Sequence, residues 1–266
     1  MYKTQYIVKH FRFCTGQGII LSAEKSDEKR LIEMCVKVEN PIEVMSRYEI
    51  KYILSPEQTE MMKIRLEGHM LPDAFGRTSI ASVYYDTPDY RLIRASIEKP
   101  VFKEKMRLRS YGLATDSSPV FLELKRKADG IVYKRRIRST IPAVRQFMEE
   151  NEDLEETGQI EREINYFKHF YEDLQPACLI IYDRTAYFEK EGDLRLTIDE
   201  NPRYRFDDIS LTHNMEGDLL LPYGSAILEV KAQNSIPLWL THILSAHQIY
   251  QGSFSKYGSA YLKKIA

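Results

Sequence analysis

Polar and apolar residues alternate along several short segments of this chain, and this period of two is typical of β-strands with one polar and one apolar face. The clearest segments are 47–51, 103–109, 123–127, 134–138, 195–199 and 229–231. Together with more uniformly apolar runs, they predict about eight strands. We expect these strands over 47–54, 80–86, 101–112, 120–127, 131–141, 177–189, 194–199 and 223–232.

Segments with helical periodicity or helix-starting residues separate these strands. Ser55, Pro56 and Gln58 form a capping-box pattern that begins a helix reaching about residue 70. Further helices are expected over 142–151, 160–174, 236–250 and 254–265. Asp129-Gly130 predicts a tight hairpin between two alternating runs. Long strands joined by hairpins favour an antiparallel sheet, and therefore an α+β fold.

The polar positions of the strands are mostly cationic. Arg107 and Arg109 are two residues apart, as are Lys125 and Lys127, and Lys134 is followed by Arg136 and Arg138. A single row of this kind is more often a solvated sheet face. Several rows in one chain favour a binding site, because Arg and Lys are the usual partners of phosphate oxygens. If the sheet curls with these rows inward, it forms a basic tunnel for a polyanion.

Carboxylates lie in register with the basic positions at Glu49, Glu123, Asp199 and Glu229. Carboxylates that share Mg²⁺ or Mn²⁺ with substrate phosphates are the usual arrangement for phosphoryl chemistry. The alternative is that they pair with Lys and Arg on neighbouring strands. Glu229 is the better metal candidate, because the strand around it is mostly apolar and a buried carboxylate needs a partner.

Composition narrows the possible functions. The 266 residues contain 38 Lys and Arg against 39 Asp and Glu, a formal net charge of -1, so we expect no nucleic-acid partner. The three cysteines show no Cys-x-x-Cys spacing, which argues against a zinc site or disulfide framework and favours the cytoplasm. No run of about 20 apolar residues encodes a membrane span. Residues 1–44 are interpreted as an N-terminal extension of unclear structure, and 45–266 as one domain.

Taken in order, the segments from about Met45 to Lys264 resemble the VTC domain, the polyphosphate-polymerase domain of the vacuolar transporter chaperone family, within the triphosphate tunnel metalloenzyme (CYTH-like) superfamily. The segments that carry this resemblance are 47–52, 83–86, 107–111, 123–125, 182–187, 195–199, 227–231 and 254–257. The resemblance implies an antiparallel eight-stranded β-barrel tunnel with helices packed outside.

The resemblance also implies roles for individual residues. The expected catalytic residues that contact phosphates are Lys51, Arg107, Arg109, Lys125, Lys134, Arg184, Arg195 and Lys256. Tyr182, Ser255, Lys231, Lys127 and Arg136 are expected to assist substrate binding. The expected ligands of Mn²⁺ or Mg²⁺ are Glu229, Glu49 and Glu123.

The implied reaction moves the γ-phosphoryl group of ATP onto a growing inorganic polyphosphate chain. Two alternatives stay open: a tunnel triphosphatase that hydrolyses inorganic triphosphate or a nucleotide, and a non-catalytic polyphosphate-binding module. Tunnel triphosphatases often begin with Glu-x-Glu-x-Lys, whereas Arg47 occupies the first of these positions here, which favours the polymerase. A separate membrane protein is a possible partner, and the sequence leaves the oligomeric state open.

Overall fold

The computed structural model describes residues 48–129, 131–150, 152–233 and 235–266, all within one compact unit, Ser46–Ala266. Its longer strands are β1 (Tyr48–Leu54), β3 (Thr78–Asp86), β4 (Phe102–Tyr111), β5 (Val120–Ala128), β6 (Ile131–Ser139), β7 (Gln175–Phe188), β8 (Arg195–Arg205) and β10 (Ala226–Ala232). Three two-residue strands are β2 (Leu71–Pro72), β9 (Asp218–Leu219) and β11 (Gln251–Gly252). The expected N-terminal extension and Arg47 lie outside the described residues.

Six helices lie within the part of the chain that the structure describes. They are α3 (Pro56–Leu66), α4 (Arg91–Ile97), α5 (Ile141–Glu149), α6 (Gln159–Tyr171), α7 (Leu238–Ala246) and α8 (Lys256–Ile265). The capping box that begins α3 is formed as predicted, since Ser55 Oγ accepts from the Gln58 backbone and Gln58 Oε1 accepts from the Ser55 backbone. Ser255 likewise caps α8 through the Gly258 amide at 3.2 Å.

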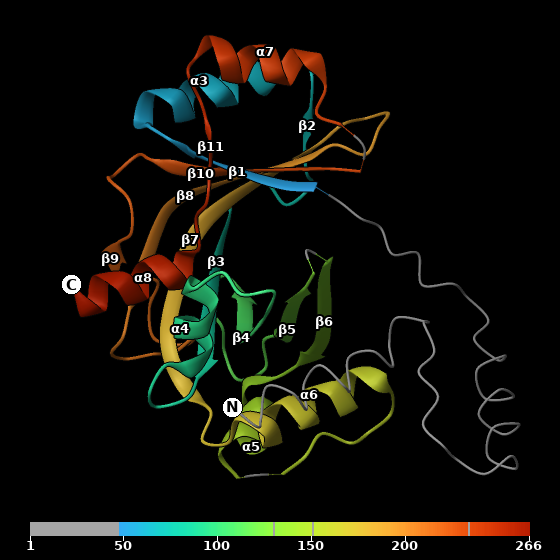
Figure 1. Ribbon diagram of the computed structural model, residues 1–266, viewed down its shortest axis with the longest axis vertical. Coiled ribbons are helices and arrows are strands. Elements are labelled where there is room, and N and C mark those ends of the chain that lie inside the picture. The colour runs from blue at the N-terminus through green and yellow to red at the C-terminus, as the bar shows by residue number, and fades with distance from the viewer. Residues whose placement is uncertain (1–47, 130, 151, 234) are drawn as a thin grey trace, which may run out of the picture. The chain divides into compact units, whose positions relative to one another are not determined.

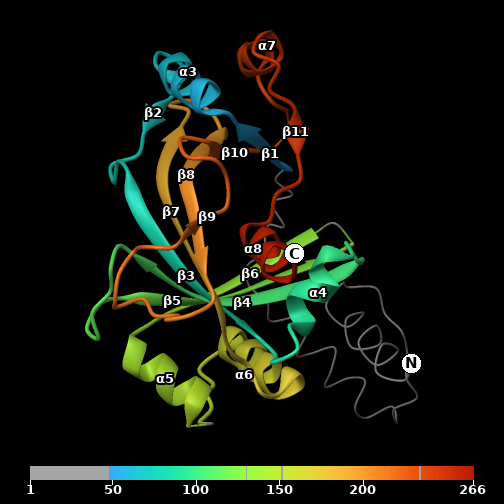
Figure 2. The same cartoon turned by 90° about the vertical axis from the view of Figure 1, so that its left-hand side faces the viewer.

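All strands belong to one antiparallel sheet, in the order β11-β1-β10-β8-β7-β3-β4-β5-β6, with β2 paired to β7 and β9 to β8. The sheet curls so that β1 and β10 face β4 and β5 from opposite ends (Figures 1 and 2). The predicted hairpin at 129–130 joins β5 to β6 with Ala128 opposite Ile131. The antiparallel α+β class is therefore confirmed.

The closed eight-stranded barrel, in contrast, was wrong. The sheet has eleven strands, and within the described residues no ladder joins β6 to β1 or β11. The facing walls meet through long side chains, with Lys125 Nζ on β5 lying 3.9 Å from Glu49 Oε2 on β1. Side-chain layers between sheets need about 10 Å, whereas a backbone ladder needs about 4.8 Å, so walls separated in this way cannot pair.

The apolar faces of the strands are covered by helices on the outside of the curl. α3 and α7 pack on β1, β8 and β10 around Leu196, Ile198 and Leu228, which are fully buried. α5 and α6 pack on β3, β4 and β5 around Met106 and Leu122.

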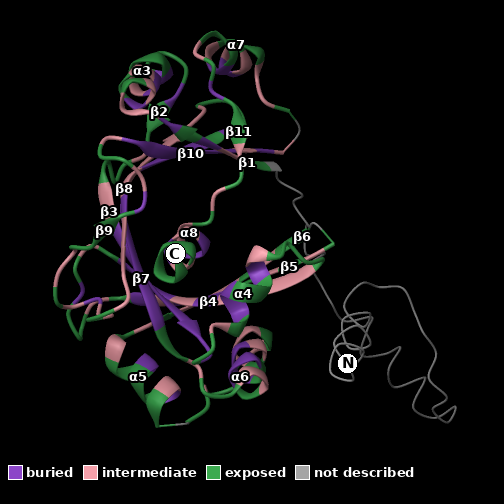
Figure 3. Cartoon of the chain, turned by 60° about the vertical axis from the view of Figure 1, so that its left-hand side comes forward, coloured by how far each residue is buried: buried purple, intermediate pink, exposed green. Residues whose placement is uncertain are grey.

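Two helices differ from the expected outside position. α8 and α4 contribute Tyr257 and Ile93 to a cluster with Ile80, Tyr84 and Tyr182, which lie on the inner face of β3 and β7. Figure 3 shows α8 within the curl of the sheet, between its two ends. The inner face is therefore partly lined by a helix, and this brings the first turn of α8 to the charged strand positions.

Candidate active site

Most of the charged residues predicted for the site share one inner face of the curled sheet. Residues directly opposite each other in an antiparallel ladder point to the same side. The register places Lys51 opposite Glu229, Arg184 opposite Asp199, and Arg107 opposite Glu123. We call this surface the charged face, and its members are Glu49, Lys51, Lys103, Lys105, Arg107, Arg109, Glu123, Lys125, Lys127, Lys134, Arg136, Arg184, Arg195, Thr197, Asp199, Glu229 and Lys231. Cations outnumber carboxylates on it.

Glu123 is the centre of the first cluster. Its carboxylate receives Arg107 Nε at 2.7 Å, Arg136 Nε at 2.6 Å and Lys134 Nζ at 2.9 Å, with Arg109 Nε at 3.8 Å. Burial alone would raise the pKa of Glu123, but these cations hold the pKa well below its usual range. Three cations within 2.9 Å leave little room for a metal ion, so the arrangement favours the ion-pair alternative for this carboxylate.

Asp199 is the centre of the second cluster, and its side chain is fully buried. Arg184 binds it through Nε and Nη2 at 2.5 and 2.7 Å, and Lys256 Nζ lies 2.5 Å from Oδ2. Burial would raise the pKa of Asp199, but Lys256 and Arg184 lower it overall. Lys256 comes from α8, so this carboxylate joins the C-terminal helix to the middle of the sheet.

Glu229 lies beside this cluster with a less saturated carboxylate. Lys51 Nζ is 3.2 Å from Oε1, Lys231 Nζ is 3.4 Å from Oε2, and Arg184 Nη2 is 3.5 Å from Oε2. Burial opposes ionisation, but Lys256, Lys51 and the other cations hold the pKa of Glu229 well below its usual value. Glu229 is therefore ionised at neutral pH and available to bind a cation.

A carboxylate pair that could hold a divalent cation is formed by Glu229 and Glu49. Both approach the same ammonium group, Lys51 Nζ, at 3.2 and 3.6 Å. Two carboxylates fit Mg²⁺ or Mn²⁺ when phosphate oxygens and water complete the coordination. Among the described residues no group of three or more His, Cys, Asp or Glu side chains forms a metal site by itself. The predicted ligand Glu123 lies in the separate Arg-rich cluster.

The other wall of the charged face has lysines opposite lysines. Lys103 pairs with Lys127, Lys105 with Lys125, and Lys125 in turn with Lys134. Like charges directly opposite each other destabilise a sheet. Burial and the neighbouring lysines lower the pKa of Lys105 to about 8, although Tyr84 opposes the shift. An arrangement that costs stability in the free protein is suited to binding a polyanion.

Aromatic side chains line the inner face between these clusters. Arg109 Nη2 donates to Tyr182 Oη at 3.0 Å, and the Tyr182 ring lies under Arg184 and Lys256, with the cations 5.2 and 4.3 Å from its centroid. Tyr182 thus contacts all three cations. Ser255 Oγ accepts from Lys105 Nζ at 3.1 Å, which places the start of α8 against β4.

Two predicted site residues lie at the margin. Arg195, at the start of β8, is exposed, donates to the Leu194 carbonyl at 3.2 Å and stacks over the Phe188 ring. Lys127 is exposed near the β5–β6 hairpin. Both share the charged face but lie outside the clusters around Glu123, Asp199 and Glu229. They could contact a long ligand, whereas a short one would leave them free.

The structure adds Tyr84 and Lys105 to the site. Tyr84 Oη accepts from Arg107 Nη1 at 3.1 Å. Burial would raise the pKa of Tyr84, but Arg107, Lys105 and Arg109 lower it to about 8. Lys105 continues the alternation of Arg107 and Arg109, so the sequence carried a signal for it. No period-two charge marks Tyr84, whose strand reads as an apolar run.

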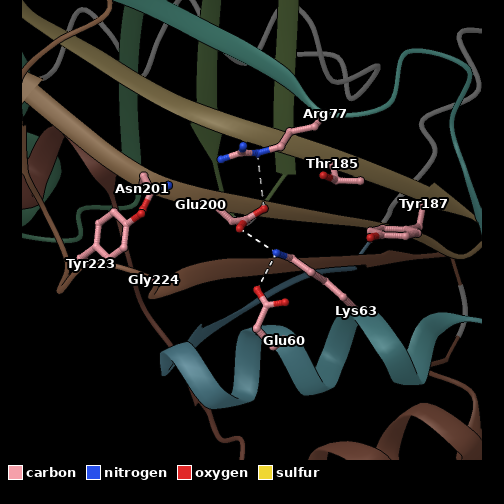
Figure 4. A pocket seen from close by; sticks show the side chains of 9 residues that line it. All are labelled: Glu60, Lys63, Arg77, Thr185, Tyr187, Glu200, Asn201, Tyr223 and Gly224. Carbon is pink, nitrogen blue, oxygen red and sulfur yellow. Dashed lines mark hydrogen bonds and ion pairs between the residues drawn. The ribbon is translucent and has the colours of Figure 1, made fainter.

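A cavity of 410 Å³ lies on the other side of β7 and β8. Figure 4 shows Lys63 between Glu60 and Glu200, 2.8 Å from each carboxylate, with Arg77 reaching Glu200 from above. Its charged groups are thus paired with one another. This cavity lacks the cation excess of the charged face, which is the better candidate site.

Comparisons with known proteins show which family and fold this chain resembles. A protein named vacuolar transporter chaperone complex subunit 4, from Schizosaccharomyces pombe, is 23% identical over 76% of this chain and 35% of its own length. The chain thus spans about a third of that relative's length. A solved "putative adenylate cyclase" from Bacillus halodurans shares the fold, with a TM-score of 0.52, 13% identity and coverage of 78% of this chain and 92% of that one.

A further solved structure is an adenylyl cyclase candidate from Hippeastrum with a reported dominant triphosphatase activity; it has a TM-score of 0.45 and 20% identity over 79% of this chain and 92% of that one. The VTC domain family matches residues 46–264, which include every described site residue. The chain therefore belongs to the VTC domain family.

Proposed function

We propose that this protein is a polyphosphate polymerase that transfers the γ-phosphoryl group of ATP to a growing inorganic polyphosphate chain on the charged face. The observation that carries the proposal is the in-register opposition of Lys105 to Lys125 and of Lys125 to Lys134, on the same face as Glu229. These lysines repel one another in the free protein, and a chain of phosphates is the ligand that would relieve the repulsion along several strands. Membership of the VTC domain family supports this choice of polyanion.

In the proposed reaction, a terminal phosphate oxygen of the polymer attacks the γ-phosphorus of ATP. A new P–O bond forms, the bond between the γ-phosphorus and the bridging oxygen breaks, and ADP leaves with that oxygen. Transfer of this kind depends mostly on positioning and on stabilising charge on the phosphoryl oxygens. Arg107 and Arg109 would orient the phosphates on one wall, while Lys51, Arg184 and Lys256 would do so on the other.

A divalent cation, Mn²⁺ or Mg²⁺, would further neutralise the phosphate charge when bound. Glu229 and Glu49 are the residues proposed to hold it, because their carboxylates converge on Lys51. The Asp199 carboxylate is already bound by Arg184 and Lys256, so Glu229 would be the better ligand for the metal ion. Nearby cations lower the pKa values of Asp199 and Glu229, which keeps these two carboxylates ionised without a metal.

A tunnel triphosphatase is the second candidate. It would use the same cations but needs a site that activates water. Among the described residues no group of three or more His, Cys, Asp or Glu side chains could hold a metal, and Arg47 stands where such enzymes often carry a further acid. This supports the polymerase over the hydrolase. A polyphosphate-binding module without activity would keep the cations and form no product.

The experiment is incubation of the purified protein with ATP and Mn²⁺, followed by a polyphosphate-staining gel and a free-phosphate assay. Long polymer together with ADP supports the polymerase. Free phosphate without polymer supports the triphosphatase, and binding of tripolyphosphate without either product supports the binding module.

The named relative belongs to a vacuolar transporter chaperone complex, so a membrane partner that accepts the product is part of the proposal. Among the helices described, none is long and apolar enough to cross a membrane.

A further inference from the structure

The start of α8 places two residues, Ser255 and Lys256, beside the charged face, although neither belongs to a strand. Lys256 Nζ lies 2.5 Å from Asp199 Oδ2 and 4.0 Å from Glu229 Oε1. Ser255 Oγ accepts from Lys105 Nζ at 3.1 Å. Residues on strands are held in place by the hydrogen bonds of the sheet. Ser255 and Lys256 belong to a helix, so other contacts must hold the start of α8 against the charged face.

Tyr257, the next residue along the chain, is the anchor. It is only 2% exposed, and its hydroxyl donates to Asp86 Oδ2 at 2.8 Å. Its ring stacks on Tyr84 with centroids 4.8 Å apart. Because Tyr257 directly follows Lys256, any displacement of the tyrosine moves the lysine as well.

Asp86 is itself held rigidly at the end of β3. Its side chain is fully buried and accepts backbone hydrogen bonds from Thr87 at 2.9 Å, Leu92 at 2.8 Å and Ile93 at 3.0 Å. These amides fix both carboxylate oxygens to the start of α4. The hydroxyl of Tyr257 therefore binds an acceptor that cannot follow it if α8 shifts.

The far end of α8 has its own attachment to the same region. Lys264 Nζ donates to Tyr90 Oη at 2.6 Å and lies 4.4 Å from the centroid of the Phe206 ring. Tyr90 is the residue that precedes α4. Both ends of α8 are thus attached around α4, and only the Tyr257 end reaches the charged face.

We propose that Asp86 and Tyr257 are positioning residues that hold Lys256, and with it Ser255, against the phosphate-binding face. This inference rests on the proposed function for its ligand, a chain of phosphates. It assigns the Asp86–Tyr257 hydrogen bond a role in phosphate binding, although neither residue is expected to touch phosphate. Tyr257 acts through its neighbour in the chain, and Asp86 acts through Tyr257.

The test is a double-mutant cycle with Y257F and K256A, read by calorimetric titration of the full chain with tripolyphosphate in metal-free buffer. We expect Y257F to raise Kd about tenfold, the order of one charge-assisted hydrogen bond. In the K256A background the same substitution should change Kd less than about twofold. An equal rise in both backgrounds would show that Tyr257 supports the site only through general stability, and would overturn the proposal.

A second readout needs no phosphate. Amine-specific labelling followed by mass spectrometry should modify Lys256 faster in Y257F than in the unaltered protein, while exposed Lys263 on the same helix is modified at the same rate. Unchanged labelling of Lys256 overturns the inference. If the unaltered protein fails to bind tripolyphosphate but the labelling changes as expected, the positioning role stands and the proposed function fails.

Y261F is the matched control. It makes the same chemical change one turn later on α8, where the Tyr261 ring packs on Tyr90 and its hydroxyl has no hydrogen-bond partner among the described residues. We expect neither Kd nor Lys256 labelling to change in Y261F. D86N is expected to change Kd and Lys256 labelling as Y257F does. Because Asp86 also accepts hydrogen bonds from the start of α4, D86N could act through that helix, and the test therefore relies on Y257F.

Discussion

Arg184 and Asp199 form a two-point ion pair in which Nε and Nη2 donate to the two carboxylate oxygens at 2.5 and 2.7 Å. The carboxylate is fully buried and also receives Lys256. The two cations therefore share a buried counterion, and their second carboxylate, Glu229, lies farther away, at 3.5 Å from Arg184 and 4.0 Å from Lys256. This arrangement makes the site part of the stability of the fold.

Substituting Asp199 with Asn should strongly destabilise the protein, because Arg184 and Lys256 lose their nearest countercharge. Removing one partner of a buried pair costs about 3–5 kcal/mol. Urea unfolding followed by circular dichroism measures the change. E60Q is the control, because Glu60 pairs with Lys63 at the surface and should contribute less than about 1 kcal/mol. Equal losses in both variants would contradict the buried role of Asp199.

Acid should destabilise the protein through the same carboxylates. Cationic neighbours lower the pKa values of Glu123, Asp199 and Glu229, despite burial that opposes this. Groups with lowered folded pKa values contribute stability above the unfolded carboxyl pKa, about 4, and this is lost as pH falls through the folded values. Urea midpoints should therefore stay level from pH 7 to 5 and fall steeply below pH 4. A level midpoint down to pH 2 would contradict this.

Lys105 should make tripolyphosphate binding sensitive to alkaline pH. Its pKa is lowered to about 8 by burial and by nearby lysines, so the free protein loses this charge as pH rises from 7 to 9. Kd should rise over this range by more than in K105R, whose guanidinium stays charged. Comparing the two proteins at each pH cancels the titration of the ligand itself.

Tyr84 titrates in the same window, since its pKa is also lowered to about 8, and its ionisation would weaken anion binding too. Y84F removes that contribution and leaves the one from Lys105. If the pH profile of K105R matches that of the unaltered protein while Y84F flattens it, the tyrosine and not the lysine is responsible.

Lys105 should also make the free energy of unfolding rise between about pH 8 and 10, because the unfolded chain keeps the proton of this lysine to higher pH than the folded chain does.

Glu229→Gln should abolish metal-dependent turnover while leaving tripolyphosphate binding in metal-free buffer within about threefold. The substitution removes the better of two metal-capable carboxylates but keeps every cation of the charged face. Product assays with ATP and Mn²⁺, beside calorimetry without metal, separate the two effects. E104Q is the control, because Glu104 pairs with Arg126 on the outer face. Retained turnover in E229Q would exclude Glu229 as the metal ligand.

Arg107→Ala and Arg109→Ala should each weaken tripolyphosphate binding about tenfold or more, because bidentate Arg contacts are the strongest available to phosphate. Arg126→Ala removes the same charge from the opposite face of β5, where Arg126 pairs with Glu104 and Glu163. It should lower stability without changing Kd. Unchanged affinity in R107A and R109A would mean that the charged face does not bind phosphates.

Much of the fold follows from local sequence patterns. The period-two alternation of 103–109 and 123–127 established that these residues are strands and which side chains share a face. Asp129-Gly130 set the β5–β6 register, and Ser55 and Ser255 marked the starts of α3 and α8. These signals act over a few residues, so no knowledge of the remaining chain is needed to interpret them.

Other features left no recognisable signal in the local pattern. α4 was not predicted, because its start is stabilised by the buried carboxylate of Asp86, five residues before the helix, and not by a side chain at its N-cap, Tyr90. The curl of the sheet depends on contacts between distant segments, since it brings Lys125 to Glu49 and holds the walls too far apart for closure.

The sequence alone determined that cations and carboxylates would share one face, because that depends only on alternation along each strand. It could not decide which carboxylate meets which cation. Glu123 meets four cations from its two neighbouring strands, β4 and β6, whereas Glu229 meets lysines from β1 and from its own strand, Arg184 from β7 and Lys256 from α8. That choice depends on strand order and register, and on a helix that enters the curl of the sheet. The tertiary structure therefore separated the ion-pair centre from the candidate metal ligand.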